Sequence, residues 1–429
     1  MPASQLARWD QADLARRVAG ALGIAAQALH ALGVPDADRP AEAAHPGPQL
    51  SSVKVAAEAS MLLFCAAPIQ GVDERIRDGV ELVARLLIPH ARSDSALAAI
   101  CIDPALARDH SVAHVILSHL GYPDPGADRL LRQSLAAGSG FGPERLPHRE
   151  LEQRWLERIH SADNAPLRPD TEILAQSSLG RPMDALGSTL LDKYAFTHCV
   201  LYASDCGGRR IVLPRSAADI AADADAALAS SLDANDFDLS AEVLWTWPML
   251  GLDWSPAATF AFQVLAAIED EIGFLPGPAF SRAKLRSLPG NRRSRYNLVT
   301  SYHTALVMGF LCAAALRPGR TPPAAVPASS SSTPAAADLM RLIAPRSPEP
   351  RWREAFRPLA PPRQNSLAPL VLTVALRRAR SLANMKLIRD ALQVALHHDL
   401  LGQPALGQAA ALLRRGAALG PARYSRPAD

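Results

Sequence analysis

The sequence predicts an all-α protein, with a multi-helix core that resembles an α/α-toroid and an appended C-terminal helical hairpin. Hydrophobic residues form 48% of the 429 residues and charged residues 20%, which is enough apolar surface for a large core. Alanine and leucine supply most of that surface, and both favour helices. Runs with the two-residue period of a strand are almost absent, apart from a short strand-like segment at 209–214.

Helices of the N-terminal half are predicted from the spacing of apolar residues and from the residues that begin and end each run. The run that follows Gly71-Val72-Asp73 has acidic residues in its first turn, where the helix dipole favours them. The sequence GYPDPG at 121–126 is a strong break between helices. The predicted helices are 4–34, 52–67, 72–91, 93–102, 105–121, 127–137 and 147–160, with connecting segments at 35–49 and 162–171.

The central part of the chain continues the helical series. A helix at 187–204 is followed by Gly207-Gly208, which is a natural helix end. No repeat of 34 or 40 residues is present, so a regular repeat array is not supported. Further helices are predicted at 217–232, 239–251, 256–272, 282–288 and 295–316.

Shifts in composition divide the chain. The segment RPGRTPPAAVPASSSSTPAAAD is rich in Pro, Ser and Ala, which is typical of a flexible linker. Basic residues then accompany two apolar helical runs near the C-terminus. We therefore expect an N-terminal helical segment and connector (1–49), a main helical domain (50–316), a linker (317–366), a basic helical hairpin (367–415) and a disordered tail (416–429).

Charge and cysteine content limit the class of protein. The 45 basic and 42 acidic residues are scattered, which argues against a nucleic-acid footprint. Five cysteines without a CxxC motif indicate buried, reduced thiols, and the N-terminus shows no apolar signal segment, so we expect a cytoplasmic protein. The longest apolar run, 299–316, is short for a bilayer span, so no membrane partner is expected. Dinucleotide, P-loop and hydrolase-elbow motifs are absent.

Three apolar helix-like runs contain histidine beside tyrosine or threonine: HSVAHVILSHLGYPD, DKYAFTHCVLYASDCGG and RYNLVTSYHTALVMGFLCAAAL. A titratable ring in such a run must find a partner, bind a ligand or stay neutral at a cost. We assign His198 and His303 as an acid/base pair, Tyr194 and Tyr302 as hydrogen-bond donors, and Asp205 as an orienting carboxylate on the same helix face as His198. The alternative is that the histidines are satisfied core residues.

Other residues are candidates for ligand contacts. Thr197 and Thr300 lie in the histidine segments, and Trp245 and Trp247 belong to a tryptophan cluster that can line an apolar cavity. Core packing of a helix kinked at Pro248 is the favoured alternative for the tryptophans. The sequence favours no particular cofactor, and a divalent metal held by two histidines and an aspartate stays open as an alternative.

A structural role is favoured for two further groups of residues, the histidines near 110–114 and Cys206. His110 and His114 have chelating spacing, but a third ligand is missing, which favours a structural role. Cys206 lies at a predicted helix C-terminus, where the dipole raises a thiol pKa, so it is rejected as a nucleophile.

The phrases LPHRELEQRWLERI, DKYAFTHCVLYASDCGG and YNLVTSYHTALVMGFLC resemble an uncharacterised family of helical proteins from actinomycetes, whose members often lie near natural-product gene clusters. The resemblance covers roughly 50–316 and includes Tyr194, Thr197, His198, Asp205, Tyr302 and His303. Where the family phrase usually has an aromatic residue, this chain has Cys206. The resemblance implies no known activity.

Two functions are therefore expected from the sequence. The first is an enzyme, or an enzyme-like component, of specialised metabolism that acts by His/Tyr/Asp acid–base chemistry on an apolar small molecule or peptide in a helical cavity. The second is a non-catalytic binding or scaffold protein, whose C-terminal hairpin recruits a partner enzyme or carrier. A cavity at the histidines would favour the first, and a solid core with a large apolar surface patch would favour the second.

Overall fold

The computed structural model describes residues 10–33, 50–138, 144–160, 170–330 and 333–418. The predicted all-α class is confirmed, because no strand occurs anywhere in these ranges. The strand-like segment at 209–214 is irregular backbone, so that detail of the prediction is wrong. Whether the helices form a closed toroid stays a prediction. The connector at 35–49 lies outside the described residues.

Five helices of the N-terminal half begin where a side chain caps the free backbone N–H groups of the first turn. Asp10, Ser51, Asp73, Ser93 and Asp124 each accept such a hydrogen bond. The helices are α1 (Gln11–Leu32), α2 (Ser52–Ala66), α3 (Glu74–Ala91), α4 (Asp94–Ile102), α5 (Ala107–His110), α6 (Val112–His119), α7 (Pro125–Ala137) and α8 (Pro147–His160), with 3-10 turns at Ala67–Ile69 and Pro104–Leu106.

The central helices are mostly buried on several sides. A capping box between Thr189 and Asp192 starts α10, and a break at Trp245 separates the two halves of the run predicted at 239–251. These helices are α9 (Thr171–Gln176), α10 (Leu190–Ala203), α11 (Ala217–Asp233), α12 (Phe237–Leu244), α13 (Thr246–Leu250), α14 (Pro256–Ile272), α15 (Arg282–Ser287) and α16 (Gly290–Ala315).

The C-terminal third differs from the linker and hairpin that composition predicted. Three short helices lie within the described part of 317–366, and Leu339, Trp352 and Phe356 from this segment are buried. Three helices then take the place of the predicted two-helix hairpin. The region contains α17 (Ala335–Leu342), α18 (Arg351–Phe356), α19 (Pro361–Ser366), α20 (Ala368–Ser381), α21 (Met385–His397) and α22 (Pro404–Ala418).

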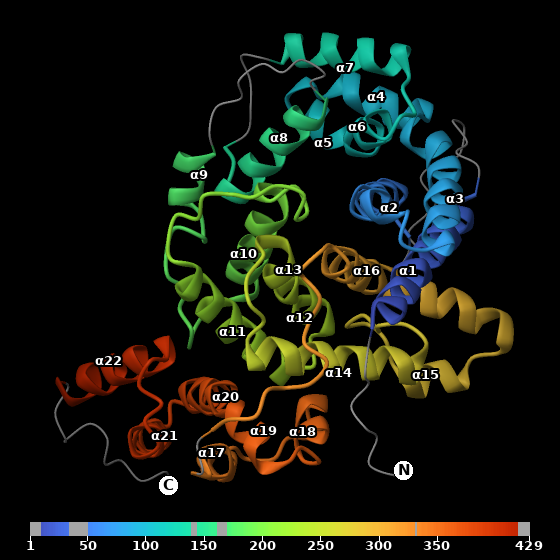
Figure 1. The fold of residues 1–429 in the computed structure, drawn as a ribbon. Coiled ribbons are helices and arrows are strands. Elements are labelled where there is room, and N and C mark those ends of the chain that lie inside the picture. The colour runs from blue at the N-terminus through green and yellow to red at the C-terminus, as the bar shows by residue number, and fades with distance from the viewer. Residues whose placement is uncertain (1–9, 34–49, 139–143, 161–169, 331–332, 419–429) are drawn as a thin grey trace, which may run out of the picture.

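One carboxylate joins this C-terminal layer to the central helices. Asp233, at the end of α11, accepts hydrogen bonds from Nε1 of Trp352 at 3.1 Å and from Nε of Arg378 at 2.8 Å. Figure 1 shows α17–α20 in one layer directly beneath α11 and α14. The C-terminal helices are therefore part of the folded core rather than a tethered module.

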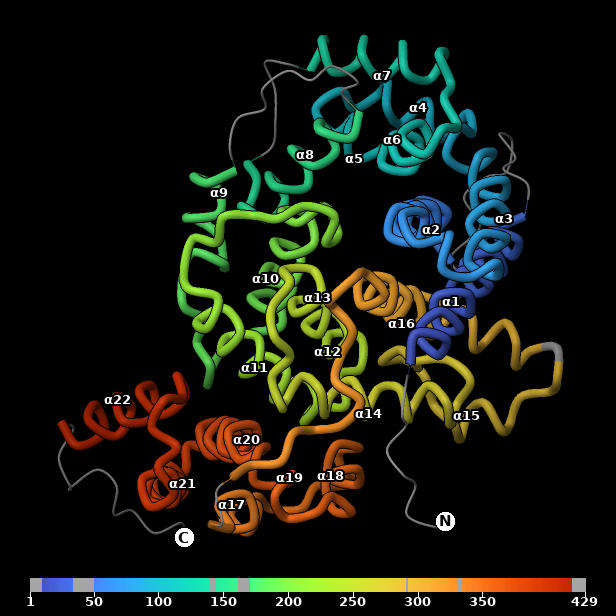
Figure 2. Tube along the Cα trace, in the orientation of Figure 1, coloured from blue at the N-terminus to red at the C-terminus, as the bar shows by residue number. Residues whose placement is uncertain are grey.

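The N-terminal helix is also part of the core. In Figure 2, α1 lies beside α16 and α3, although α16 is far away in sequence. Arg17 of α1 is 2% exposed and forms ion pairs with Asp13, Glu269 and Asp270. Helix α1 therefore packs against α16, the helix that carries His303.

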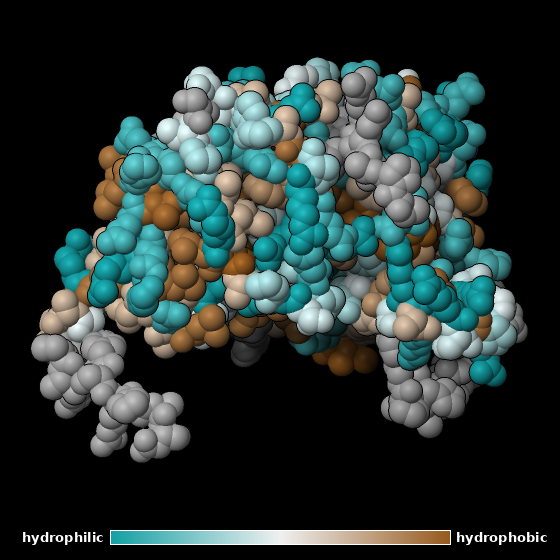
Figure 3. All heavy atoms as spheres, turned by 90° about the horizontal axis from the view of Figure 1, so that it is seen from below, coloured by the Kyte–Doolittle hydropathy of each residue, from teal (hydrophilic) through white to brown (hydrophobic). Residues whose placement is uncertain are grey.

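Two helical stretches are long and apolar enough to span a membrane, Ser52–Ile69 and Arg292–Ala315. In the structure, 83% of the second stretch is buried inside the protein, as expected for a core helix. Figure 3 shows the molecule from below, where hydrophilic side chains interrupt the hydrophobic areas.

Candidate functional site

A cavity of about 1050 Å³ opens between helices from distant parts of the chain. Its wall is formed by α2, α8, α10 and α16, with contributions from α12 and from the segment around 176–181. Apolar side chains such as Met61, Val307 and Phe310 line part of it. The ionisable side chains and tyrosines of the lining are Lys54, Glu58, Asp109, His148, Arg149, Glu152, Arg181, Asp192, Tyr194, His198, Tyr202, Glu242 and His303.

His303 of α16 lies between two carboxylates. Its Nδ1 is 2.9 Å from Oε1 of Glu58 on α2, and its Nε2 is 3.5 Å from Oδ2 of Asp238 on α12. Burial disfavours the charged ring, but Asp238 and Glu58 outweigh that cost and raise the pKa of His303 to about 10. The ring is therefore an imidazolium at neutral pH.

Asp238 and Glu242 project from the same face of α12, because they are four residues apart. Asp238 accepts hydrogen bonds from Oη of Tyr194 at 3.3 Å and from Oγ1 of Thr304 at 2.9 Å. Oγ1 of Thr197 donates to Oε2 of Glu242 at 2.7 Å. Residues from α10 and α16 thus hold both acids of α12.

Glu242 differs electrostatically from Asp238. Burial, followed by the charge of neighbouring Asp238, raises the pKa of Glu242 to about 8. Burial also opposes ionisation of Asp238, but its bonds to His303 and Thr304 leave its pKa lowered. The pair therefore contains one carboxylate and one carboxylic acid at neutral pH, an arrangement suited to proton exchange.

The same residues could hold a divalent cation. One ligand atom each from Asp238, Glu242 and His303 lies within 4.8 Å of the other two. Two carboxylates and an imidazole suit several transition metals, and the remaining nitrogen of His303 faces Glu58, the usual arrangement around a metal-bound histidine. The donor set therefore fits a metal, with Thr197 bonded to Glu242 as an outer partner.

His198 lines the cavity close to this cluster but is electrostatically different from His303. Its ring centroid lies 6.1 Å from that of Tyr194, 6.0 Å from Tyr202 and 6.0 Å from His148. No hydrogen bond to the ring is present among the described residues. Burial, and then the positive neighbours His148 and Arg149, lower the pKa of His198 to about 3, so the ring is neutral.

Asp205 lies outside the cavity lining. Helix α10 ends at Ala203, and Asp205 has a left-handed backbone with φ of 49°, so it does not share a helix face with His198. Its Oδ1 is 3.0 Å from Nη2 of Arg158, and its Oδ2 is 3.6 Å from Nε of Arg209. The structure therefore separates Asp205 from the histidines with which the sequence grouped it.

The remaining predicted site residues are divided between the cavity and the core. Trp245 lines the cavity, and its Nε1 donates to the carbonyl of Thr197 at 3.2 Å. Tyr302 and Thr300 are each 7% exposed and are not part of the lining. Trp247 is fully buried and stacks on Trp254.

The structure also shows the surroundings of His114 and of the five cysteines. His114 is fully buried, and its Nε2 lies 2.9 Å from Oδ1 of Asp128. All five cysteines are free, but Cys101 is exposed, so the expectation that every thiol is buried is wrong. Burial and the neighbouring Cys65 raise the pKa of the Cys206 thiol.

Three central acids were not identified from the sequence: Glu58, Asp238 and Glu242. Each lies in a segment predicted to be helical, and an acid on a predicted helix is ordinarily expected to face solvent. One signal was available in FDLSAEVLWTWPML, where two acids at helical spacing stand inside an almost entirely apolar run. Such a run is buried, so its acids need partners or a function.

Fold and site together define an all-α protein with a central cavity that contains a buried cluster of two carboxyl groups and an imidazolium. The chain belongs to the family described as Domain of unknown function (DUF6895), whose model matches residues 18–313. No curated protein and no solved structure matches the chain.

Proposed function

We propose that the protein is an enzyme that binds an apolar small molecule or peptide in the central cavity and exchanges protons with it. The observation that carries the proposal is the convergence of Glu242, His303 and His198 from three helices on the wall of one cavity of about 1050 Å³. That volume is at the upper end of the range typical of ligand sites. The mixture of apolar lining and a few polar groups is also typical of such sites.

The electrostatics support distinct roles for the polar groups. Glu242 is a carboxylic acid with a pKa near the working pH, so it is the group that gives a proton to a bound ligand and takes it back. The imidazolium of His303 stabilises the carboxylate that remains. Neutral His198 and the hydroxyl of Tyr194 orient the ligand through hydrogen bonds.

The cavity also bears on the rival proposal of a non-catalytic scaffold. A scaffold in which the histidines are structural needs a solid core at His198, whereas this ring lines an open cavity. Recruitment of a partner through the C-terminal helices is compatible with the enzyme proposal but does not explain a buried acid cluster. We add to the proposal a place in specialised metabolism, because the family that the chain resembles often lies near natural-product gene clusters, and a cytoplasmic location, which the cysteine content and the N-terminus favour.

The test exposes the full-length protein to a small-molecule extract of its source cells and follows retained and altered molecules by mass spectrometry. We expect the wild type to retain and alter a defined set of molecules. Glu242→Gln should retain the same set but alter it at least 100-fold more slowly. Ala195→Trp, which fills the cavity wall, should abolish retention, and the surface variant Glu81→Gln should behave as the wild type. Equal turnover by Glu242→Gln would overturn the proposal.

A second candidate is metal-assisted chemistry at the same cluster, favoured by the mutual approach of Asp238, Glu242 and His303. A bound divalent cation would supply Lewis-acid chemistry there. Its test is metal analysis of the purified protein together with thermal melting after addition of Mn²⁺ or Zn²⁺. A stoichiometric metal that Asp238→Asn removes would establish this candidate, and a melting temperature insensitive to both metals would exclude it.

A further inference from the structure

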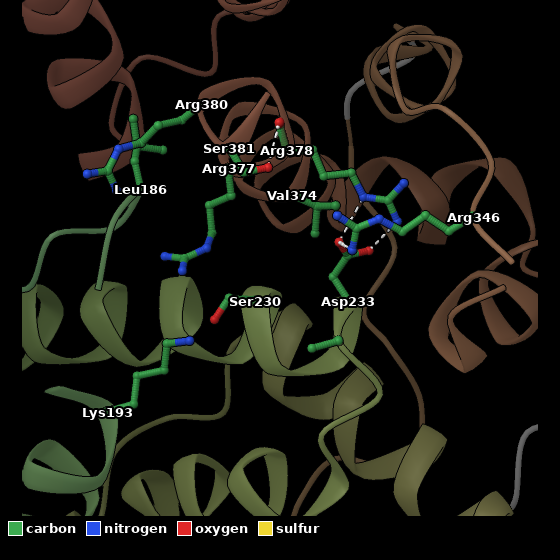
Figure 4. A pocket seen from close by; sticks show the side chains of 11 residues that line it. Leu186, Lys193, Ser230, Asp233, Arg346, Val374, Arg377, Arg378, Arg380 and Ser381 are labelled. Carbon is green, nitrogen blue, oxygen red and sulfur yellow. Dashed lines mark hydrogen bonds and ion pairs between the residues drawn. The ribbon is translucent and has the colours of Figure 1, made fainter. Parts of the chain in front are cut away.

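A second, smaller pocket lies between the central helices and the C-terminal layer. It has a volume of about 400 Å³ and is formed by α10 and α11 on one side and by α20 on the other. Figure 4 shows basic side chains from both sides reaching into this space. Its cationic lining residues are Lys193, Arg346, Arg377, Arg378 and Arg380, and its acidic lining residue is Asp233.

Lys193 is the most informative residue of this pocket. It is 7% exposed, and it forms no hydrogen bond or ion pair with any described residue. Burial, and then the positive charge of Arg377, lower the pKa of Lys193 to about 8, although the charges of Asp236 and Asp192 oppose this shift. In Figure 4, its ammonium group extends toward the space in which Arg377 ends. A buried ammonium without a partner is costly unless an anion accompanies it.

Arg377 is likewise without a carboxylate partner. Its Nη1 donates to the carbonyl of Ala185 at 2.7 Å and to Oγ of Ser188 at 3.1 Å, and its Nη2 donates to the carbonyl of Ser188 at 3.1 Å. These neutral acceptors position the guanidinium, while the carboxylates of Asp184 and Asp233 act on its charge only through space. Burial accordingly lowers the pKa of Arg377 from its ordinary value.

The acids nearest to the other cations of the pocket do not form ion pairs with Lys193 or Arg377. Asp233 is bonded to Arg378 at 2.6 Å and lies 3.4 Å from Arg346, so its charge is already shared between two guanidinium groups. Arg380, 40% exposed, is 3.6 Å from Asp184 at the rim. The pocket therefore has an excess of positive charge in its buried part, around Lys193 and Arg377.

We infer that this pocket binds a phosphorylated small molecule, with Lys193 and Arg377 contacting the phosphoryl group. Guanidinium and ammonium groups are the usual ligands of phosphoryl oxygens, and two cations without a bonded carboxylate match a dianion. A volume of about 400 Å³ exceeds the needs of free phosphate and leaves room for an organic part. A concave pocket rather than an exposed basic stripe disfavours a nucleic-acid chain.

The ligand would bridge α10 and α11 to α20, so binding should also tighten the C-terminal layer against the core. This site is separate from the central cavity, and none of its lining residues belongs to the cavity. The inference therefore stands independently of the proposed enzyme function.

The test is isothermal titration of the full chain with inorganic phosphate, pyrophosphate and a short oligonucleotide at constant ionic strength. Lys193→Met is the central variant, because the ammonium makes no bond whose loss would unfold the protein. Lys386→Met is the matched control, since it removes the same charge from an 81% exposed side chain on α21. Ser230→Asp, which introduces an acid into the pocket, is an independent second variant.

We expect pyrophosphate to bind the wild type and Lys386→Met equally. Lys193→Met should weaken binding at least tenfold, and Ser230→Asp should abolish it. Phosphate alone should bind more weakly than pyrophosphate. The inference is overturned if the wild type binds neither anion, if Lys193→Met binds as well as Lys386→Met, or if only the oligonucleotide binds.

Discussion

Glu58, Asp238, Glu242 and His303 show how burial and charge act on single side chains. Glu58, Glu242 and His303 line the cavity and Asp238 lies behind them, and the imidazolium contacts Glu58 and Asp238 directly. The remaining acid, Glu242, is buried beside the charge of Asp238 and accepts its hydrogen bond from the neutral hydroxyl of Thr197. In the protein interior, the protonated form of Glu242 is therefore lower in free energy than the ionised form at neutral pH.

The proton on Glu242 makes stability depend on pH. Its pKa is about 8 in the folded protein and near 4.5 in the unfolded chain, so between these values the folded state holds a proton that the unfolded state has lost. Stability from this group is therefore lost as the pH rises from 4.5 through 8. We expect the free energy of unfolding of the wild type to fall, relative to Glu242→Gln, by roughly 2–4 kcal/mol between pH 5 and pH 8.

Urea denaturation of both proteins at several pH values measures this difference. His303 also titrates, because its pKa of about 10 makes its contribution decline from pH 6.5 upward, but it is present in both proteins. Parallel curves for the wild type and Glu242→Gln would show that Glu242 is already ionised at pH 5.

The two cavity histidines should respond differently to removal. His303→Ala leaves the carboxylates of Glu58 and Asp238 without their cation, so we expect a loss of about 3 kcal/mol in the free energy of unfolding at pH 7. His198 makes ring contacts alone, and His198→Ala should cost less than about 1 kcal/mol. Equal losses in denaturant unfolding would contradict this assignment of a charged and a neutral ring.

Among these residues, the histidines could be predicted from the sequence, but the acids could not. A histidine in an apolar run is unusual enough to be noticed, whereas a lone glutamate such as Glu58 looks like a surface residue. The contact between Glu58 and His303 depends on long-range packing of α2 against α16, which no local pattern encodes. Asp205 was grouped with His198 because the helix was expected to continue past Ala203.

Among the helices, the contact between α11 and α20 attaches the C-terminal region to the central core. Asp233, 9% exposed, receives hydrogen bonds from Trp352 and Arg378, which come from two C-terminal helices. Composition predicted a linker in this region because Pro, Ser and Ala are frequent in it. The sparse residues that decide its packing, Leu339, Trp352 and Phe356, have little weight in a composition average.

Removing this joint should be costly. Asp233→Ala leaves the 6% exposed guanidinium of Arg378 without its carboxylate, so we expect a loss of about 3–5 kcal/mol in unfolding free energy. Asp390→Ala, which breaks a pair with the exposed Lys386 on α21, is the control and should cost less than about 0.5 kcal/mol. Comparable losses in thermal or urea denaturation would mean that α20 is loosely attached.

At the scale of the whole molecule, the helical class followed from composition and from the absence of strand periodicity. The boundary of the folded unit could not be predicted in the same way. The family match ends at residue 313, yet the buried core continues through α17 and α20. Leu370, Val371 and Leu372 of α20 are almost completely buried, so the cavity-bearing region and the C-terminal layer share one core.

A chain that ends at residue 316 should therefore fold poorly. The truncation uncovers the face of α11 that contacts α20 and leaves Asp233 unpaired. We expect it to aggregate or to melt more than about 5 °C below the full chain in calorimetry. A soluble fragment with an unchanged melting temperature would restore the picture of an appended module.

The proton that Glu242 holds at neutral pH, inside a cavity open to ligands, can be observed directly. Infrared difference spectroscopy of the metal-free wild type against Glu242→Gln measures that proton directly. We expect a carboxylic acid band at pH 7 that disappears with a midpoint near pH 8 and is missing in the variant. A wild-type spectrum without this band at pH 7 would show an ionised Glu242 and would contradict the proposed proton exchange.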